Sequence, residues 1–415
     1  MGLVKTSILT AISTLIRVFT SFIINKLVSI YIGPSGLGLI GQFQNFVMIS
    51  STLATGAISQ GVVKYTAEYR NNMDKTGKLL TTALIISLLS SITVGLFLNI
   101  FSTYFSEHIL KSNIYSTIFN IFGFTIILFS LNTLLISILN GQKEIKKYII
   151  VNIISSLFSL LFTSFLVIEF GLFGLLYAMI LNISIIFFIT LYLVLNSSWF
   201  HLNYFTDRFD RDSAIKLGKY AVMAVVSATT APLSQMFVRD YIGNGIGWES
   251  AGYWQGIWYI SSMYLMVVTT SLGVYYLPRL SEIEDKMELK NEIFNGYKII
   301  LPIVICIAFG IYILREHIVY IVFTERFMPM VELFKWQLIG DVIKISSWLL
   351  SYLMLAKAMT QLYVYTEIIF SAIFVYLSIS FIDRFGLIGV TYAFCLNYVL
   401  YLITMIIIFK GGLNE

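Results

Sequence analysis

Long apolar stretches separated by short polar turns dominate the pattern of this 415-residue chain. Each stretch has about 20 residues or more, the length that an α-helix needs to cross the hydrocarbon core of a bilayer. The pattern predicts twelve spans, over residues 7–32, 38–66, 79–104, 114–140, 148–168, 172–195, 216–242, 250–277, 296–314, 330–356, 361–382 and 387–409. We therefore expect an all-α, polytopic membrane protein.

One predicted span carries a polar stripe. At about 100° per residue, one side of the helix expected over residues 334–357 presents Gln337, Asp341, Lys344, Trp348 and Ser351. An ionisable group at mid-depth in a bilayer costs at least ~2.5 kcal/mol, so such residues usually face a partner or a wet cavity. We expect this stripe to line a cavity.

Two interpretations of the charged pair on this stripe stay open. Asp341 and Lys344 are i,i+3 neighbours, so they can neutralise each other within the helix. Alternatively, Lys344 meets an anion of the substrate, while Asp341 is the site for a coupling proton or cation. Glu367, inside the following span, is a second candidate for a coupling carboxylate.

The first predicted span also has a polar side, and Arg17 lies near its middle. The guanidinium group offers a fork of donors that suits phosphate or carboxylate, and it remains charged when buried. Arg17 either contacts the substrate or pairs with a carboxylate on another helix. Lys26 points roughly to the opposite side, where it either extends toward the membrane surface or joins a cavity that wraps around the helix.

Two further cations lie near the ends of predicted spans. Lys64 precedes Glu68 by four residues, a spacing that favours a solvated pair at the helix end over a substrate contact. Arg239, followed by Asp240, is expected at the outer mouth, where a structural salt bridge and a contact that recruits substrate are both compatible with the sequence.

Trp254, Trp258 and Ser261 share one face of the span over residues 250–277. Aromatic residues near a helix end are typical of the belt at the membrane interface, and we favour that interpretation. The alternative is a stacking platform for sugars, whose apolar faces aromatic rings can cover.

Composition excludes a soluble protein and disfavours an enzyme. Apolar residues make up 58% of the chain, charged residues 12%, and the mean hydropathy is +0.85, as in polytopic membrane proteins. The three histidines, His108, His201 and His317, lie in or beside loops without a serine or cysteine elbow. No paired carboxylates, metal-ligand spacing or phosphate loop occurs in a segment outside the spans. We expect no catalytic residue and no bound metal.

The distribution of basic residues predicts the orientation. Of the 27 lysines and arginines, eighteen fall on the side of the N-terminus, five on the other side and four within or close to spans. Lysine and arginine accumulate in cytoplasmic loops. Both termini are therefore expected in the cytoplasm.

The second half of the chain repeats the first. Residues 170–182 and 385–397 are identical at eight of thirteen positions, at an offset of 215. A shorter match relates residues 31–33 to 241–243. Six spans in each half predict two lobes, residues 1–205 and 206–415, related by a pseudo-twofold axis along the membrane normal. Transporters with such repeats place a substrate site between the halves and work by alternating access.

The repeat also bears on the polar stripe. At the offset of 215, Asp341 and Lys344 correspond to Ile126 and Phe129. The first-half copy therefore forms its span without these charges, and the architecture alone does not require them. This favours a functional role, chiefly for Lys344.

Several motifs resemble those of Wzx-type flippases of O-antigen and other lipid-linked oligosaccharides, which are polysaccharide transporters of the multidrug/oligosaccharidyl-lipid/polysaccharide (MOP) exporter superfamily. They are IGPSGLG at 32–38, GVVKY at 61–65, YLPRLS at 276–281, WQLIGDVIK at 336–344 and AKA at 356–358. The resemblance covers essentially the whole chain. It implies outward movement of an undecaprenyl-diphosphate-linked oligosaccharide across the bacterial inner membrane, through a basic central cavity.

The resemblance also implies which residues and partners take part. The diphosphate or glycan is expected to meet Arg17, Lys26, Lys64, Arg239, Lys344 and Trp348, with Asp341 and Glu367 as coupling or structural carboxylates. Lys357 is also charged in the family, whereas Asp240 is not. The implied partners are the lipid-linked oligosaccharide, membrane lipids, a glycan polymerase and a chain-length regulator, with no nucleic acid and no cofactor beyond a coupling proton or sodium ion.

Two other functions are compatible with this composition. A cation-coupled exporter of drugs or small molecules belongs to the same superfamily. A membrane glycan polymerase or ligase would need a large outer loop to hold its reactive groups, and every predicted outer loop is short.

Overall fold

The computed structural model describes residues 3–357 and 359–412, and every regular element in that part of the chain is a helix. Nine of the described helices are long and apolar enough to cross a membrane, and a bent pair raises the number to ten. The prediction of an all-α, multi-pass membrane protein is confirmed.

The helices form two compact units. Unit 1 comprises Met1–Ile32 with Gln42–Pro232, and unit 2 comprises Gly33–Gly41 with Leu233–Glu415. Pro232, an imino acid that cannot donate to the helical hydrogen-bond ladder, lies inside α8 where unit 1 ends. The division into lobes at residue 205 stays a prediction.

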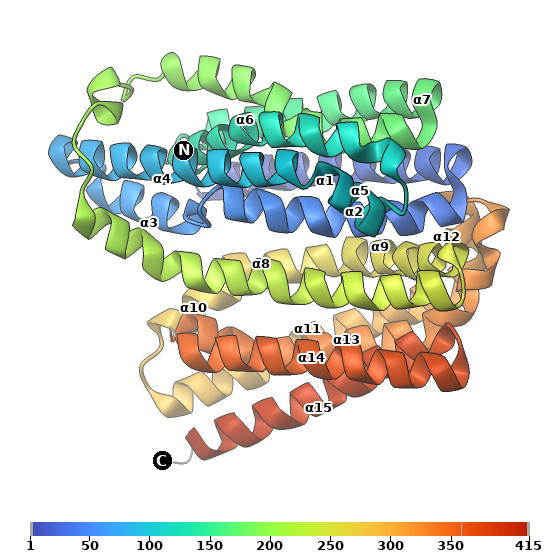
Figure 1. The fold of residues 1–415 in the computed structure, drawn as a ribbon. Helices are drawn as coiled ribbons and strands as arrows, with labels where there is room; N and C mark the ends of the chain where they lie inside the picture. Colours follow the sequence, from blue (N-terminus) through green and yellow to red (C-terminus); the bar gives the residue numbers. More distant parts are fainter. Residues whose placement is uncertain (1–2, 358, 413–415) are drawn as a thin grey trace. The chain divides into compact units, whose positions relative to one another are not determined.

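Unit 1 contains the helices from the first half of the chain, several of which run alongside one another in Figure 1. They are α1 (Leu3–Tyr31), most of α2 (Gly33–Ala54), α3 (Ser59–Tyr69), α4 (Met73–Ile100), α5 (Ser102–Leu110), η1 (Asn113–Tyr115), α6 (Ser116–Gly141), α7 (Ile145–Leu195), η2 (Leu202–Phe205) and the first part of α8 (Arg211–Gly245). An apolar core joins α3, α4, α6, α7 and α8, with Val62, Leu80, Ile138, Val194 and Leu217 fully buried or nearly so.

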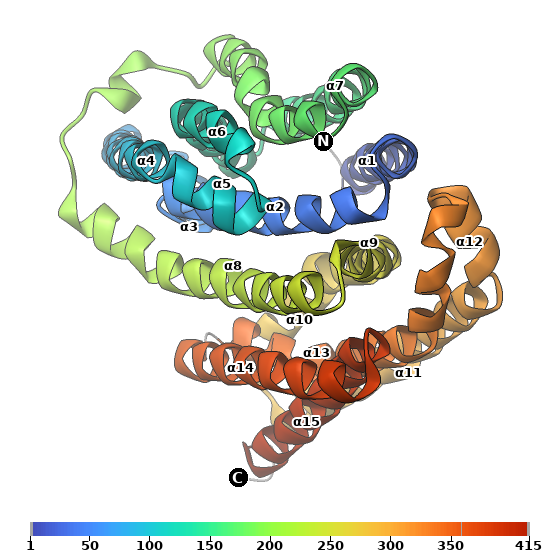
Figure 2. The ribbon, with the colours of Figure 1, turned by 45° about the vertical axis from the view of Figure 1, so that its right-hand side comes forward.

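Unit 2 contains the start of α2, the end of α8 and all later helices. These are α9 (Trp248–Ser271), η3 (Leu272–Tyr276), α10 (Leu277–Glu282), α11 (Lys286–Ile313), α12 (Arg315–Val322), η4 (Glu325–Leu333), α13 (Phe334–Ala356), α14 (Thr360–Phe385) and α15 (Ile388–Gly412). Ile345, Leu349 and Met354 place α13 inside the core of this unit. Figure 2 shows α13, α14 and α15 close together, in orange and red.

The predicted spans over residues 148–168 and 172–195 lie within α7, which is 51 residues long. A straight helix of that length would measure about 77 Å, more than twice the ~30 Å of a hydrocarbon core. Gly171, at φ 54° and ψ −128°, interrupts it. Asn182 Nδ2 donates to Ser159 Oγ at 3.1 Å and to Thr163 Oγ1 at 3.2 Å. Only arms that run back along each other can make these contacts, so α7 is a helical hairpin.

Unit 2 repeats this hairpin between α14 and α15. Gly386 has φ 66° and ψ −150°, close to the conformation of Gly171, which favours glycine because it has no Cβ. A Cβ at Gly174 would overlap the backbone of Leu166, and one at Gly389 would overlap the backbone of Phe381. All these pairs are 215 residues apart, so the hairpin repeats at the offset that the sequence predicts.

The shorter match between residues 31–33 and 241–243 is not a structural repeat. Gly33 has φ 74° ahead of α2, whereas Gly243 lies inside α8. The positive-φ glycine that precedes α9 is Gly247. The match was wrong because three residues carry too little information to fix a register.

The span predicted over residues 38–66 is broken. α2 and α3 meet at a bend of 41°, with Gly56 and Ala57 at positive φ between them. The Ser130 hydroxyl donates to Ala54 O at 3.0 Å, which satisfies a carbonyl that the break releases from its helix.

α9 coincides with the span predicted over residues 250–277 but is not among the nine helices, because its glutamine, serines and aromatic residues lower its hydropathy.

Candidate functional site

The Lys344 ammonium lies among four aromatic rings inside unit 2. Its Nζ is 4.6 Å from the ring centre of Trp348, 5.3 Å from Trp258, 5.7 Å from Tyr398 and 6.0 Å from Phe394. The rings come from α9, α13 and α15. Cation–π contacts of this kind contribute from ~0.5 to ~2 kcal/mol each, more when they are desolvated. We call Lys344 and these four rings the aromatic cage.

The cage holds Lys344 without a direct ion pair in the described part of the chain, although the carboxyl groups of Asp341 and Glu367 lie close enough to act on its charge. Among residues 3–357 and 359–412, Lys344 makes no ion pair and its side chain makes no hydrogen bond. Asp341, one turn earlier on α13, was expected as one of two alternatives to neutralise Lys344 directly. The two side chains form no direct ion pair among the described residues, but they lie close enough to interact electrostatically, so this alternative stays a prediction.

Asp341 is instead held by three neutral donors. Its side chain is fully buried. Ser261 Oγ donates to Oδ2 at 2.7 Å, Tyr264 OH donates to Oδ2 at 2.9 Å, and Gln337 Nε2 donates to Oδ1 at 3.3 Å. A buried carboxylate is tolerated only with such partners. The arrangement positions Asp341 near the cage and leaves the Lys344 ammonium available.

A cavity of about 300 Å³ opens beside the cage. Its lining combines the cage residues Trp258, Lys344 and Trp348 with polar and apolar side chains of α9: Ser261, Ser262, Leu265, Met266 and Thr269. Trp258 Nε1 is buried and has no hydrogen-bond partner among the described residues. The cavity therefore offers a cation and an indole N–H to an incoming acceptor.

Trp254 of α9 does not lie in an interfacial belt. Trp254 is fully buried, and its Nε1 has no hydrogen-bond partner within the described chain. A belt residue would keep this N–H in the wet headgroup region. Trp254 packs edge-to-face on Trp258, with ring centres 6.2 Å apart. The favoured interpretation was therefore wrong for Trp254, because unit 2 covers this face of α9 with its own helices.

The remaining site candidates lie outside the cage. Glu367, on α14, is half-buried and has no hydrogen bond or ion pair within residues 3–357 and 359–412. Arg17, on α1, is exposed, and its guanidinium has no carboxylate partner in the same ranges. Lys26, also on α1, is half-buried. The roles assigned to these residues stay predictions.

Lys64 contacts tyrosine side chains of α3 and α8. Its Nζ donates to Tyr220 OH at 2.7 Å and lies 5.2 Å from the ring centre of Tyr65 and 5.3 Å from that of Tyr220. No direct ion pair joins Lys64 and Glu68 among the described residues, but Glu68 acts on the Lys64 charge from a greater distance, so the solvated pair stays a prediction. The phenol that α8 brings to Lys64 could not be predicted from the spacing along α3.

Arg239 lies in the interior of unit 2, with 1% of its surface exposed. Its Nη2 donates to Gln255 Oε1 at 2.5 Å, and the guanidinium lies 5.3 Å from the ring centre of Trp254. A Cβ at Gly41 would overlap the Gln255 side chain. Arg239 therefore helps to join α8 to α9 and the start of α2, and its contact with substrate stays a prediction.

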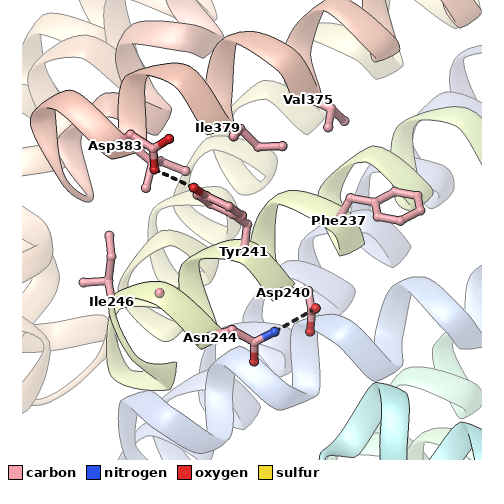
Figure 3. A pocket seen from close by; sticks show the side chains of 10 residues that line it. Phe237, Asp240, Tyr241, Asn244, Ile246, Val375, Ile379 and Asp383 are labelled. Atoms are coloured by element: carbon pink, nitrogen blue, oxygen red, sulfur yellow. Dashed lines mark hydrogen bonds between the residues drawn. The ribbon is translucent and has the colours of Figure 1, made fainter.

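A second, larger cavity of about 620 Å³ lies between α8 and α14, near the ends of both helices. Figure 3 shows Tyr241 and Asp383 pointing toward each other across it, with Tyr241 OH donating to Asp383 Oδ1 at 2.5 Å. Asn244 Nδ2 donates to Asp240 Oδ2 at 3.0 Å along α8. Phe237, Val375 and Ile379 form its apolar part, so this cavity suits a cation or an apolar group better than an anion.

Sequence reasoning found Asp341, Lys344 and Trp348 and also singled out their partners Gln337, Trp258 and Ser261, but it missed three others. Tyr264, Phe394 and Tyr398 lie on other helices at positions that look apolar or interfacial. No group of three or more histidine, cysteine, aspartate or glutamate side chains suited to a metal ion occurs within residues 3–357 and 359–412.

Comparisons with known proteins agree with this architecture. A model of a family described as "Polysaccharide biosynthesis protein" matches residues 31–332. Two proteins named "Lipid III flippase", from Escherichia coli (strain K12) and Shigella flexneri, are each 27% identical over 403 residues, covering 97% of this chain and 96% of the relative.

Solved structures of transporters share the fold. An inward-facing multidrug resistance MATE family transporter of the MOP superfamily superposes with a TM-score of 0.80 at 14% identity, covering 96% of this chain and 94% of that one. An outward-facing MATE transporter gives a TM-score of 0.72 at 15% identity, covering 99% and 96%. The expected MOP-type fold is confirmed.

Proposed function

The chain belongs to the polysaccharide biosynthesis protein family, and from this premise we propose that it flips a lipid-linked oligosaccharide across the membrane as a transporter, not as an enzyme. The observation that carries the proposal is the full-length similarity to two proteins named lipid III flippase. The charged side chains of Lys344 and Asp341 in unit 2 supply the physical means, since a polar headgroup cannot cross bare hydrocarbon without a polar path.

The substrate is an undecaprenyl-diphosphate-linked oligosaccharide repeat unit. Its diphosphate carries negative charge, and its sugars present hydroxyl groups and apolar faces. Lys344 offers N–H donors that no acidic side chain occupies among the described residues, so a diphosphate can bind there without first breaking an ion pair. Trp258 and Trp348 give the cavity beside Lys344 aromatic walls on which a sugar ring can lie.

Transport proceeds by alternating access between lobes that span residues 1–205 and 206–415, coupled to a proton or sodium gradient. Asp341 and Glu367 are the carboxylates assigned to coupling or to structural support. Arg17, Lys26, Lys64 and Arg239 supply further positive charge for the diphosphate and glycan. These assignments rest on residue chemistry and on the resemblance of the chain to Wzx-type flippases.

The protein functions in the bacterial inner membrane with both termini in the cytoplasm. The excess of lysine and arginine on one side of the predicted topology supports this orientation. A glycan polymerase and a chain-length regulator, which use the repeat unit after it has crossed, are its proposed partners.

Depletion of the protein tests the function. We expect lipid-linked repeat units to accumulate in the cytoplasmic leaflet, measured by the accessibility of the labelled glycan in sealed inverted and right-side-out vesicles. A pool that stays unchanged while surface glycan disappears would contradict the proposal. Complementation of flippase-null strains with defined glycans then identifies the sugars.

A cation-coupled exporter of small molecules is the second candidate. The cavity between α8 and α14, with Asp240, Asp383 and apolar walls, supports this alternative because it suits an amphiphilic cation. Efflux of a cationic dye that depends on the protein, without any change in the pool of lipid-linked repeat units, would favour the exporter.

A further inference from the structure

Two lysines and three tyrosines of unit 1 form a second group of cation–aromatic contacts. Lys64 on α3 donates to Tyr220 OH on α8 at 2.7 Å, and Lys216 on α8 donates to Tyr69 OH on α3 at 2.8 Å. Tyr65 lies between them, 5.2 Å from Lys64 Nζ and 5.9 Å from Lys216 Nζ. We call these five residues the lysine–tyrosine cluster. Its hydrogen bonds cross between the same two helices.

In the part of the chain that the structure describes, no carboxylate is in direct contact with the lysines of the cluster, although Glu68 acts on both of them from a greater distance. Neither Lys64 nor Lys216 forms an ion pair among the described residues. Glu68 lies on α3 but contacts neither ammonium group within ion-pair distance. Asp210, just before α8, accepts a hydrogen bond from Ser213 N at 2.8 Å and is used in capping that helix. Lys75 adds a third cation, 5.7 Å from the ring centre of Tyr69.

Hydrogen-bond donors remain available in the cluster. An ammonium group has three N–H donors, and one of them is used on a phenol in each pair. Each phenol oxygen accepts from its lysine, so its own O–H is free to donate. Lys64 and Lys216 are exposed, Tyr65 and Tyr220 are half-buried, and Tyr69 is buried beneath Lys216, to which its hydroxyl is hydrogen-bonded. The rings therefore fix the lysine stems while the charged ends face outward.

This combination fits an anion with many oxygens, and the position indicates its source. The charge distribution places the end of α3 and the start of α8 on the cytoplasmic side. A diphosphate has enough oxygens to accept from both ammonium groups and both phenols at once, and charge-assisted bonds of this kind are the strong ones. A single phosphate ester of a bulk lipid offers fewer acceptors.

We propose that the lysine–tyrosine cluster is the docking site for the diphosphate of the lipid-linked oligosaccharide at the inner leaflet, where the substrate binds before it reaches the aromatic cage. The proposal rests on the proposed function. It assigns a role to Lys216, Tyr69 and Tyr220, and it gives Lys64 a role at the entrance instead of within a central cavity.

Binding to the full chain in nanodiscs of zwitterionic lipid tests the proposal, with undecaprenyl diphosphate as the probe. The double variant Lys64→Gln/Lys216→Gln should weaken binding at least ~10-fold, since charge-assisted hydrogen bonds to both lysines are lost. The matched control is Lys146→Gln, which removes one exposed lysine of unit 1 that makes no tyrosine contact among the described residues. It should change binding by less than ~2-fold.

Three outcomes would overturn the proposal. Unchanged binding in the double variant would make the cluster a clamp between α3 and α8 only. An equal loss in Lys146→Gln would indicate general surface charge. If phosphatidylglycerol displaces undecaprenyl diphosphate when both are present at the same phosphate concentration, the cluster is a site for bulk anionic lipid. The charge-preserving variant Lys64→Arg/Lys216→Arg, which should retain most of the binding, guards against loss by misfolding.

The two levels of hypothesis fail in different ways. If depletion causes repeat units to accumulate but the double variant binds undecaprenyl diphosphate normally, the docking site is wrong and the flippase function stands. If depletion leaves the pool unchanged, the function itself is wrong whatever the probe binds.

Discussion

Two groups of lysines in this chain are held by aromatic rings, and they differ in what else reaches the ammonium. In the aromatic cage of unit 2, Lys344 is half-buried, makes no side-chain hydrogen bond among the described residues and has four rings around it. In the lysine–tyrosine cluster of unit 1, Lys64 and Lys216 are exposed and each donates to a phenol. Both arrangements keep a positive charge without a carboxylate in contact.

The difference suggests that the aromatic cage and the lysine–tyrosine cluster have different roles in transport. A half-buried cation with no hydrogen-bond partner binds an incoming anion with a large gain in free energy, because little water remains to compete for its N–H donors. An exposed cation gains less binding free energy from each contact with the substrate. The substrate meets it first, however, and can dissociate from it again. We therefore expect changes at the cage to stop transport and changes at the cluster to alter apparent affinity.

Loss of the cage cation should have the largest effect. We expect Lys344→Ala to lower transport at least ~100-fold, since a loss of ~3 kcal/mol of charge-assisted hydrogen bonding corresponds to that factor. The measurement is flipping of labelled lipid-linked oligosaccharide in proteoliposomes, with protein accumulation checked in membranes. Lys335→Ala, on the same helix with its ammonium 5.6 Å from the Trp336 ring centre, is the control. Activity close to wild type in Lys344→Ala would remove the cage from the mechanism.

Neutralising the carboxylate beside the cage should have the next largest effect. Asp341→Asn keeps the size of the side chain but removes the charge that Ser261, Tyr264 and Gln337 stabilise. We expect transport to fall about 10-fold, equivalent to ~1.4 kcal/mol, and to lose its response to an imposed proton or sodium gradient. Asp383→Asn, in the cavity of Figure 3, should keep that response. An unaltered gradient response in Asp341→Asn would reject a coupling role.

Removing the phenol hydroxyls of the cluster should have a smaller effect. Tyr69→Phe/Tyr220→Phe keeps the rings and both lysines but removes the crossed hydrogen bonds. We expect the half-saturating substrate concentration to rise about 3-fold to 5-fold, from losing ~1 kcal/mol of hydrogen bonding, with maximal transport nearly unchanged. Tyr65→Phe is the matched control, because the Tyr65 ring contacts both lysines but its hydroxyl makes no hydrogen bond among the described residues. A fall in maximal rate alone would contradict these different roles of the cage and the cluster.

The smallest predicted effect is that of removing the Asp210 carboxyl, which lies at the start of α8 near the lysine–tyrosine cluster, on the free energy of unfolding. Hydrogen bonds from the side chain and backbone of Ser213 hold the pKa of the Asp210 carboxyl below its ordinary value. A depressed pKa in the folded state gives stability that is present above the unfolded pKa, about 4, and is lost as pH falls through the folded value. Asp210→Ala should cost about 1 kcal/mol, as for other helix caps.

Thermal unfolding in detergent between pH 3 and 7 measures this effect. The wild type should approach the variant as the pH falls. A constant difference between the two across that range would show that the Asp210 charge contributes nothing to stability.

The long helices could be predicted from the sequence because each depends on local hydropathy alone. The span expected to hold the polar stripe agrees closely with α13, Phe334–Ala356. The repeat at an offset of 215 predicted the second hairpin. A tight turn at positive φ favours glycine whatever surrounds it, so Gly171 and Gly386 mark equivalent turns in the sequence. The break between α2 and α3 was not predicted, because Ala57 adopts φ 55° there, a conformation that alanine rarely takes and that hydropathy does not reveal.

The charged residues of the site could be predicted from the sequence, and so could some residues that contact them, Gln337, Trp258 and Ser261, but the other contacts could not. Lys344 and Asp341 stand out because ionisable residues are costly within a span. Their neighbours Tyr264, Phe394 and Tyr398 do not, since aromatic residues are common in any membrane helix. Lys64 shows the same limit of prediction from the sequence. The spacing along α3 suggested Glu68 as its partner, whereas the packing of α3 against α8 places Tyr220 OH within hydrogen-bond distance.

The glycine hairpins at Gly171 and Gly386 also bear on how the chain enters the membrane. Each turn is short, with Glu169 beside the first and Asp383 and Arg384 beside the second as the charged residues nearby, so only a short hydrophilic stretch has to be carried across during synthesis. The two arms can therefore insert together as a unit. Lengthening either turn with charged residues should cause misinsertion of the arm that follows it, which glycosylation mapping of nascent chains would detect.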